Sequence, residues 1–94
     1  MSVWPTAPLA SSEGALVSVS ITVDARHLES LLEALASVSF PINPEIRHDH
    51  AVSIVEFPAY EPHVAEVRSA LAAFRFAPEI VHTRGMWEAI GAGA

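Results

Sequence analysis

The 94-residue sequence contains no cysteine, which excludes disulfide bonds, thiolate nucleophiles and thiolate metal ligands together. Any metal site would have to use histidine and carboxylate side chains. The sequence also lacks a continuous apolar run of the roughly 18 to 20 residues that a membrane-spanning helix needs. Residues 1–12 have neither the basic start nor the apolar stretch of a secretory signal, so we expect a soluble, cytoplasmic protein with no membrane partner.

Basic residues are scarce as well. The chain carries 5 of them, all arginine, against 11 acidic residues, and its formal net charge at pH 7 is −6. The phosphate backbone of a nucleic acid would be repelled by such a surface unless the arginines converged, so we expect no nucleic acid partner. The sequence has no nucleophile elbow, phosphate-binding glycine loop or zinc-protease motif, and we therefore predict neither a cofactor nor a catalytic centre.

Apolar residues, in contrast, are abundant: 51% of the chain is hydrophobic, and its mean hydropathy is +0.35. A chain of this length builds one small domain, and small domains leave much of their surface exposed. We expect part of the apolar surface to meet a second subunit. Residues 15–90 are predicted to form the domain, with disordered tails at residues 1–14, which include Trp4, and at residues 91–94.

The order of secondary structure follows from the periodicity. Apolar and polar residues alternate from Ala15 to Asp24, which predicts a strand with one buried face. Asp24 is a suitable N-cap for an amphipathic helix over residues 25–38, which the prolines at 41 and 44 cannot continue. The remaining predicted elements are strands at 45–48 and at 51–57, the latter closed by Pro58, a helix at 61–74, a strand at 79–84 and a helical turn at 86–90.

Strand, helix, strand, strand, helix, strand is the order of the ferredoxin-like α/β sandwich. Right-handed crossovers then place both helices on one face of a four-stranded antiparallel sheet with strand order 4-1-3-2, and the other face stays open. We place Val55 and Phe57 of the third strand in the core. The open face then carries the candidate ligand or interface residues Ser18, Ser20, Thr22, Val52, Ile54 and Glu56.

A mixed apolar patch of this kind is typical of an interaction surface. A homodimer formed through the open face or through the edge strands would cover it. Glu56 could be a general base, if a pocket raised its pKa. The other interpretations are a solubilising charge at the edge of the sheet and the ion-pair partner of a cross-strand arginine, Arg47 or Arg84.

His48 and His50 would share a face in a regular strand and could then bind one metal ion. A turn at Asp49 would make the two side chains diverge, and only Glu45, Asp49 and His82 remain as further candidate ligands. We nevertheless interpret this stretch as the turn of a hairpin in which Asp49 accepts hydrogen bonds from backbone amides.

The two helix starts carry other polar candidates. Tyr60 and His63 flank the first turn of the second helix, where free amides favour an anion, but Glu61 occupies the same place and favours a capping role. Arg26 and His27 begin the first helix, against the helix dipole, and we interpret them as solvated side chains.

In size and in the order of their elements, residues 15–84 resemble ACT-type and PII-like regulatory modules and the small signal-peptide-binding chaperones of periplasmic nitrate reductase. The resemblance implies a small-molecule or peptide ligand. We expect a non-catalytic, homodimeric binding or regulatory module. The alternatives are a small dimeric barrel-type enzyme that acts on a hydrophobic substrate through Glu56 or His48, and a maturation chaperone that pairs a peptide with an edge strand.

Overall fold

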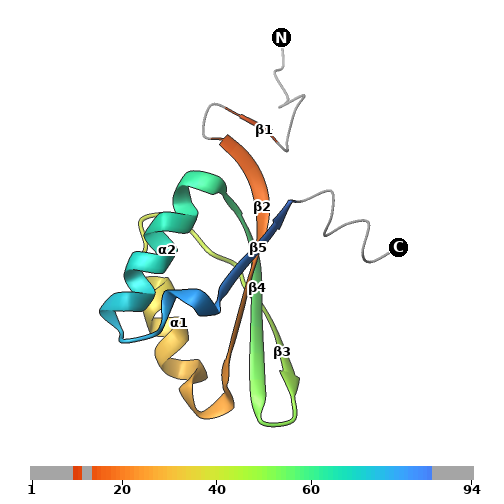
Figure 1. The fold of residues 1–94 in the computed structure, drawn as a ribbon, viewed down its shortest axis with the longest axis vertical. Helices are drawn as coiled ribbons and strands as arrows, with labels where there is room; N and C mark the ends of the chain where they lie inside the picture. Colours follow the sequence, from red (N-terminus) through yellow and green to blue (C-terminus); the bar gives the residue numbers. More distant parts are fainter. Residues whose placement is uncertain (1–9, 12–13, 86–94) are drawn as a thin grey trace.

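The computed structural model describes residues 10–11 and 14–85 (Figure 1). Predictions that concern Trp4 and the rest of residues 1–9, the C-terminal helical turn and the tail at residues 91–94 lie outside these residues. The strands are β1 (Ala10–Ser11), β2 (Gly14–Asp24), β3 (Glu45–Asp49), β4 (Val52–Tyr60) and β5 (Val81–Gly85). The helices are α1 (Leu28–Ala36) and α2 (Glu61–Ala73), with short 3-10 turns η1 (Ala25–His27) and η2 (Pro78–Ile80).

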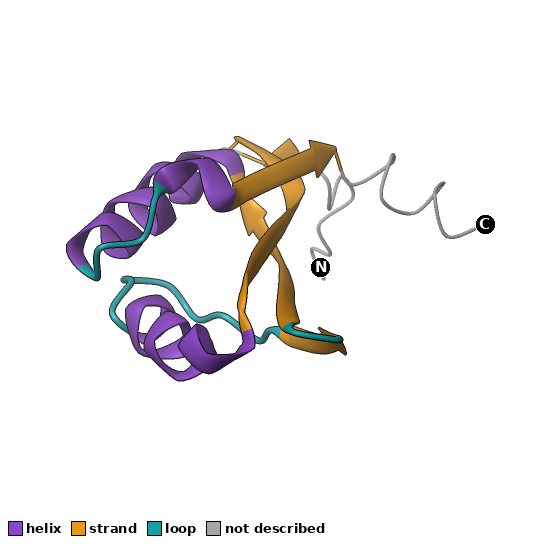
Figure 2. Cartoon of the chain, turned by 60° about the horizontal axis from the view of Figure 1, so that its bottom comes forward, coloured by secondary structure: helices purple, strands orange, loops and turns teal. Residues whose placement is uncertain are grey.

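The strands β2 to β5 form one antiparallel sheet. β2 pairs with β4 on one side and with β5 on the other, and β3 pairs with β4, so the order across the sheet is β5-β2-β4-β3. Both helices lie on the same side of the sheet (Figure 2). The predicted α+β architecture, a four-stranded antiparallel sheet with two helices, is therefore confirmed, and neither helix covers the second face.

The core fills the space between the helices and the sheet. Val55 and Phe57 are 0% and 2% exposed, which confirms the predicted orientation of their strand. Each large apolar side chain buried in this way stabilises the fold by about 1.5 to 3 kcal/mol. The other buried apolar residues are Val17, Val19, Ile21 and Val23 of β2, Leu31, Ala34 and Leu35 of α1, Ala59 of β4, Val64, Val67 and Leu71 of α2, and Val81 of β5.

The structure contains a short strand that the sequence does not predict. Ala10 and Ser11, which the sequence assigns to a tail, pair with Ala15 and Gly14 at the beginning of β2. Gly14 has a φ angle of 101°, which L-residues rarely adopt. A Cβ atom at this position would lie 3.0 Å from Cδ of Pro62, so the absence of a side chain lets β2 begin against the first turn of α2.

The first helix is shorter than predicted, although Asp24 does act as an N-cap. The Asp24 carboxylate accepts a hydrogen bond from the Arg26 amide at 3.1 Å, but the turn that it caps is η1, and α1 begins only at Leu28. The helix ends at Ala36, where the Ser37 hydroxyl donates to the Ala34 carbonyl at 2.7 Å and so competes with the helical pattern. Similarly, η2 delays the start of the last strand to Val81.

The second helix agrees with the predicted span and ends in a Schellman motif. The Phe76 amide donates to the Leu71 carbonyl at 2.9 Å, and the Arg75 amide donates to the Ala72 carbonyl at 3.0 Å. This motif needs a left-handed residue, and Arg75 supplies it with a φ angle of 69°. Glycine normally occupies such a position because it has no Cβ atom.

Pro58 does not close its strand, contrary to the sequence prediction. β4 continues to Tyr60, with Pro58 opposite Ser18. Asp49 and Val52 are the closing pair of the two-residue turn between β3 and β4. In such a pair the N–H and C=O groups of each residue point toward the other strand, so the nitrogen of Val52 faces β3. By alternation along β4, the nitrogen of Pro58 also faces the β3 side. The pairing with β3 stops at Glu56, opposite Glu45, so the proline removes no hydrogen bond from the sheet.

Candidate functional site

The open face of the sheet brings together all the residues that the sequence predicts for it. Val17 and its alternate neighbours in β2 point into the core, so the residues between them lie on the opposite face. The same alternation applies to β4, where Val55 and Phe57 point inward. The pairing register places the predicted residues side by side, Ser20 opposite Glu56 and Thr22 opposite Ile54, with Ser18 and Val52 on the same surface.

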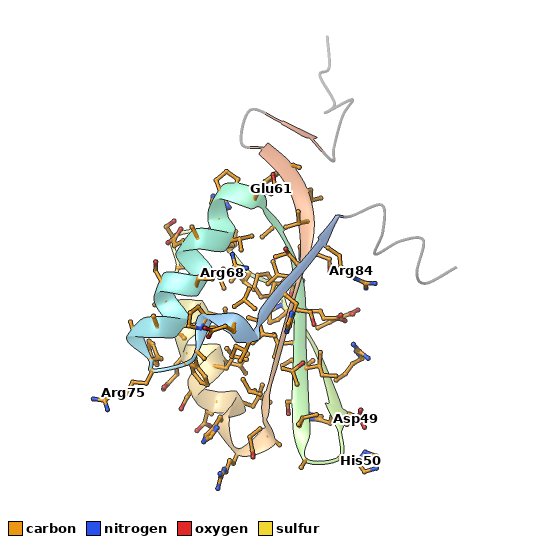
Figure 3. All side chains as sticks on the ribbon, in the orientation of Figure 1. Asp49, His50, Glu61, Arg68, Arg75 and Arg84 are labelled. Carbon is orange, nitrogen blue, oxygen red and sulfur yellow. The ribbon has the colours of Figure 1, made fainter. Side chains whose placement is uncertain are left out.

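The edge strands add charged side chains to this face. β5 contributes His82 and Arg84, and β3 contributes Glu45, Arg47 and Asp49. Arg84 and Asp49 project from the sheet on the side away from the helices (Figure 3). The basic groups of β5 and the carboxylates of β3 thus lie at opposite edges of the same surface.

Glu56 is held in a cross-strand ion pair. Nη2 of Arg47 lies 3.3 Å from Oε1 of Glu56, whose side chain is 27% exposed. Glu45 lies directly opposite Glu56 in the register, and two carboxylates in this position repel each other unless a cation intervenes. Of the interpretations of Glu56, the geometry favours the ion-pair partner, and Arg47 rather than Arg84 is that partner.

A polar hollow of about 430 Å³ lies on the open face next to Glu56. It is lined by Ser18, Asn43, Glu45, Glu56, Phe57 and Pro58. The hollow is wide and open, whereas a carboxylate that acts as a general base needs an enclosed pocket and a second polar group positioned on the substrate. Its chemistry is that of a surface that binds polar or cationic groups.

The structure separates the two histidines of the hairpin. Nδ1 of His48 lies 3.0 Å from the hydroxyl of Ser53, which is fully buried on the helix side of the sheet. Nδ1 of His50 lies 2.8 Å from Oδ1 of Asp49 in the turn. Asp49 therefore pairs with a side chain rather than with the backbone amides that the sequence suggests. Within residues 10–11 and 14–85, no group of three or more His, Asp or Glu side chains could hold a metal ion.

Tyr60 and His63 pack in an aromatic cluster instead of capping α2. Tyr60 occupies the N-cap position but makes no side-chain capping bond. The His63 ring stacks on Phe40, with centroids 4.2 Å apart and planes at 10°, and the Tyr60 ring meets His63 edge-on at 6.4 Å and 75°. The periodicity of the sequence does not predict this cluster, because Phe40 belongs to the loop between α1 and β3.

These rings form one wall of a cavity that we call the aromatic groove. It has a volume of about 450 Å³ and lies where β4 continues past the end of β3. It is lined by Leu16, Ser39, Phe40, Pro41, Pro58, Ala59, Tyr60 and His63.

The loop that forms the outer wall of the aromatic groove is anchored to α2. The Glu66 carboxylate accepts a hydrogen bond from the Ser39 amide at 2.6 Å and another from the Ser39 hydroxyl at 2.8 Å. These two bonds, with a smaller contribution from His63, lower the pKa of Glu66 below its ordinary value. The carboxylate therefore remains charged, and the anchor intact, throughout the neutral pH range.

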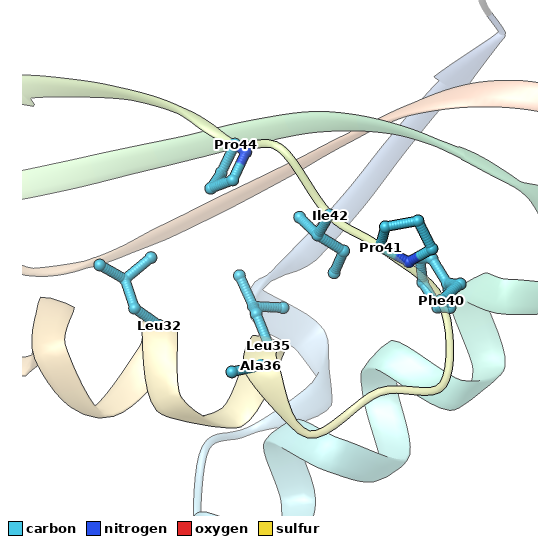
Figure 4. A pocket seen from close by; sticks show the side chains of 7 residues that line it. All are labelled: Leu32, Leu35, Ala36, Phe40, Pro41, Ile42 and Pro44. Carbon is cyan, nitrogen blue, oxygen red and sulfur yellow. The ribbon is translucent and has the colours of Figure 1, made fainter.

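A smaller hollow lies on the other side of Phe40 and Pro41 (Figure 4). Its volume is about 220 Å³, and it is lined by Leu32, Leu35, Ala36, Phe40, Pro41, Ile42 and Pro44. None of these side chains has a polar group that could orient a ligand. This hollow is a gap in the packing between α1 and the loop.

Comparison with protein-family models, with curated proteins and with solved structures finds no match for this chain. In the part of the chain that the structure describes, no helix is long and apolar enough to cross a membrane.

Proposed function

We propose that the protein is a non-catalytic binding module of the ferredoxin-like type that forms a homodimer through the open face of its sheet. The strand order β5-β2-β4-β3, with both helices on one side, supports the ferredoxin-like assignment. The observation that carries the dimer is the distribution of charge on the open face. His82 and Arg84 lie at its β5 edge, and the carboxylates of Glu45 and Asp49 lie at its β3 edge, where Arg47 is already paired with Glu56.

This distribution is self-complementary under a two-fold rotation. Two sheets that stack face to face keep their strands within about 30° of each other. If the two-fold axis lies between the sheets and parallel to the strands, β5 of each copy lies over β3 of the other, and every contact occurs twice. His82 and Arg84 of one copy then meet Glu45 of the second copy.

The centre of the face supplies the apolar part of such an interface. Val52 and Ile54 are only half-buried, although they belong to β4, an inner strand of the sheet. The hydroxyls of Ser20 and Thr22 lie beside them and remain able to bond water or the second copy. Covering the two apolar side chains contributes roughly 25 cal/mol for each Å² removed from water.

The same arrangement gives the polar hollow beside Glu56 a function. In the stacked dimer, β5 of the second copy covers the hollow and adds Arg84 to its carboxylates. A surface depression thereby becomes an enclosed site built from both copies, the form that small-molecule sites usually take. Ligand binding and dimerisation would then be linked, because a ligand that binds only the dimer stabilises it.

A charge-swap experiment tests the proposed dimer. Sedimentation velocity would be measured for the unmodified chain, for Arg84→Glu, for Glu45→Arg and for the double variant. Each single reversal replaces two attractive contacts with two repulsive ones, and exposed pairs contribute about 0.2 to 1 kcal/mol each. We expect dimer affinity to fall about tenfold or more in each single variant and to recover in the double variant.

The matched control is Glu33→Arg, which makes the same charge change on an exposed position of α1. It should leave the dimer unchanged, whereas Ile54→Asp should give a monomer. A monomeric unmodified chain at all concentrations would reject the proposal. Equal weakening in Glu33→Arg, or no recovery in the double variant, would reject the proposed geometry.

A further inference from the structure

We propose that the aromatic groove is a binding site for a small, uncharged, planar aromatic molecule that carries one hydrogen-bonding group. The site goes beyond the proposed dimer, because the groove lies past the end of β3 and is complete within one copy of the chain. Four features support it: volume, ring geometry, charge and an available hydroxyl.

The volume and lining of the aromatic groove suit a small-molecule ligand better than those of the two hollows described above. At about 450 Å³ it lies within the range of roughly 300 to 1,000 Å³ that small-molecule sites occupy. The hollow beside Leu32 has about half this volume, at about 220 Å³, and no polar group. The hollow beside Glu56 is of similar size, about 430 Å³, but it is lined by two carboxylates and would be covered in the proposed dimer.

The rings in the wall favour a flat aromatic guest. His63 and Phe40 are nearly parallel at 10° and present a stacked pair, while Tyr60 stands at 75° to His63. A planar molecule can therefore meet one ring face-on and another edge-on, the two arrangements that aromatic pairs prefer. Apart from Ser39, whose hydroxyl donates to Glu66, the remaining wall consists of Leu16, two prolines and Ala59, whose side chains offer only hydrocarbon contact.

The charges around the groove favour a neutral guest. Among the residues that the structure describes, no carboxylate and no guanidinium lines it. Glu66 lies directly behind Ser39, its pKa is lowered, and its charge opposes an anion in the groove. Both oxygens of this carboxylate are already engaged by Ser39, so it is not available to an ammonium group either.

The Tyr60 hydroxyl can orient the guest. Tyr60 is half-buried, and its hydroxyl has no hydrogen-bond partner among the residues that the structure describes. A phenol or an indole would supply that partner. The groove walls are also held in advance by the Ser39–Glu66 anchor and by Pro41, which limits the ordering that a ligand would have to impose.

An NMR titration of the full chain tests the site. The probes are p-cresol and indole, with benzoate and benzylamine as charged analogues of similar size, and the readout is the amide shifts in a ¹H–¹⁵N correlation spectrum. We expect saturable shifts at Leu16, Ser39, Ala59 and Tyr60 with the neutral probes. The charged analogues should bind at least tenfold more weakly.

Two variants and one control complete the test. Tyr60→Phe keeps the ring and removes the hydroxyl, so it should weaken p-cresol binding about fivefold. His63→Leu should weaken both neutral probes by tenfold or more because it removes the stacked ring, while its spectrum reports whether the fold persists. The control, Leu32→Ala, alters the smaller hollow and should leave binding unchanged.

Several results would overturn the site: no saturable shift with either neutral probe, equal binding of benzoate or benzylamine, shifts confined to the open face, or unchanged p-cresol affinity in Tyr60→Phe. Sedimentation of the same samples separates this proposal from the dimer. A monomeric chain that binds p-cresol in the groove would support the site and reject the dimer.

Discussion

Glu66 and Ser39 join the second helix to the loop that follows the first, through two hydrogen bonds of 2.6 and 2.8 Å to one carboxylate. The chain therefore positions Phe40, the neighbour of Ser39, through a charged hydrogen bond rather than through apolar packing alone.

The stabilising effect of this contact should depend on pH. Hydrogen bonds from Ser39 lower the pKa of Glu66 in the folded chain below its ordinary value of 4.5. A lowered folded-state pKa stabilises the fold above the unfolded value, and this contribution is lost as the pH falls through the folded one. The difference in free energy of unfolding between the unmodified chain and Glu66→Gln should be constant near neutral pH and shrink below about pH 4.5.

Urea denaturation at a series of pH values measures this difference. Glu33→Gln, on an exposed position of α1, is the matched control and should show no such pH dependence. If the difference in free energy of unfolding between the unmodified chain and Glu66→Gln were as large at pH 3 as at pH 7, the hydrogen bonds of Ser39 would not depend on the charge of Glu66.

The buried hydroxyl of Ser53 predicts an asymmetric pair of substitutions. Ser53 is fully buried and contacts Nδ1 of His48 at 3.0 Å. Ser53→Ala removes the polar group with its bond and should cost about 0.5 to 1.5 kcal/mol, whereas His48→Ala leaves the hydroxyl buried without this partner and should cost about 1 to 3 kcal/mol. Chemical denaturation checks the order, and the double variant should resemble Ser53→Ala. A smaller loss in His48→Ala would show that the hydroxyl has another partner.

The two phenylalanines at 57 and 74 give a direct test of the core. Phe57 is 2% exposed between the sheet and the helices, and Phe74 is 40% exposed at the end of α2. Phe57→Ala should destabilise the fold by about 3 to 5 kcal/mol, a large part of the stability of a small domain. Phe74→Ala should lower the free energy of unfolding by less than about 1 kcal/mol. Thermal and urea unfolding measure both variants. If Phe57→Ala and Phe74→Ala lowered the free energy of unfolding by similar amounts, the orientation of β4 described here would be wrong.

The end of α2 predicts a substitution that stabilises the protein. Arg75 adopts a φ angle of 69° in the Schellman motif, where an L-residue is strained by about 1 kcal/mol and glycine is not. Arg75→Gly should therefore raise the free energy of unfolding by up to about 1 kcal/mol. Arg68→Gly, in the middle of the same helix, should lower it by about 1 kcal/mol. Thermal denaturation of the two variants should move in opposite directions, and a loss in both would reject the motif.

The sequence predicts the strands well where burial alone decides their pattern. Val19 and Ile21 alternate with serine and threonine because one face of β2 meets the core, and this alternation is visible in the chain itself. The orientation of Phe57 follows from the same rule. The cross-strand pair of Glu56 is also predictable, because its partner lies on the neighbouring strand of a short hairpin.

Features that depend on the path of a loop were not predictable. Phe40 and His63 are far apart in the sequence, and their stacking depends on how the loop after α1 crosses the end of the sheet. The pairing of Ala10 and Ser11 has no periodic signal because the strand is only 2 residues long. Pro58 gave a misleading signal, since the effect of a proline in a strand depends on which neighbour its nitrogen faces.

That orientation of Pro58 also limits how the sheet can grow. Beyond Glu45, the outer edge of β4 pairs with no strand in the described residues, and an unpaired strand edge can accept an extended segment of another molecule. Such a segment would find no N–H donor at Pro58, so one of its carbonyls would lose a partner and the growing ladder would be interrupted. β3 is shorter than β4 and leaves this edge unpaired, but Pro58 hinders the addition of further strands, and so the aggregation of copies, at this edge.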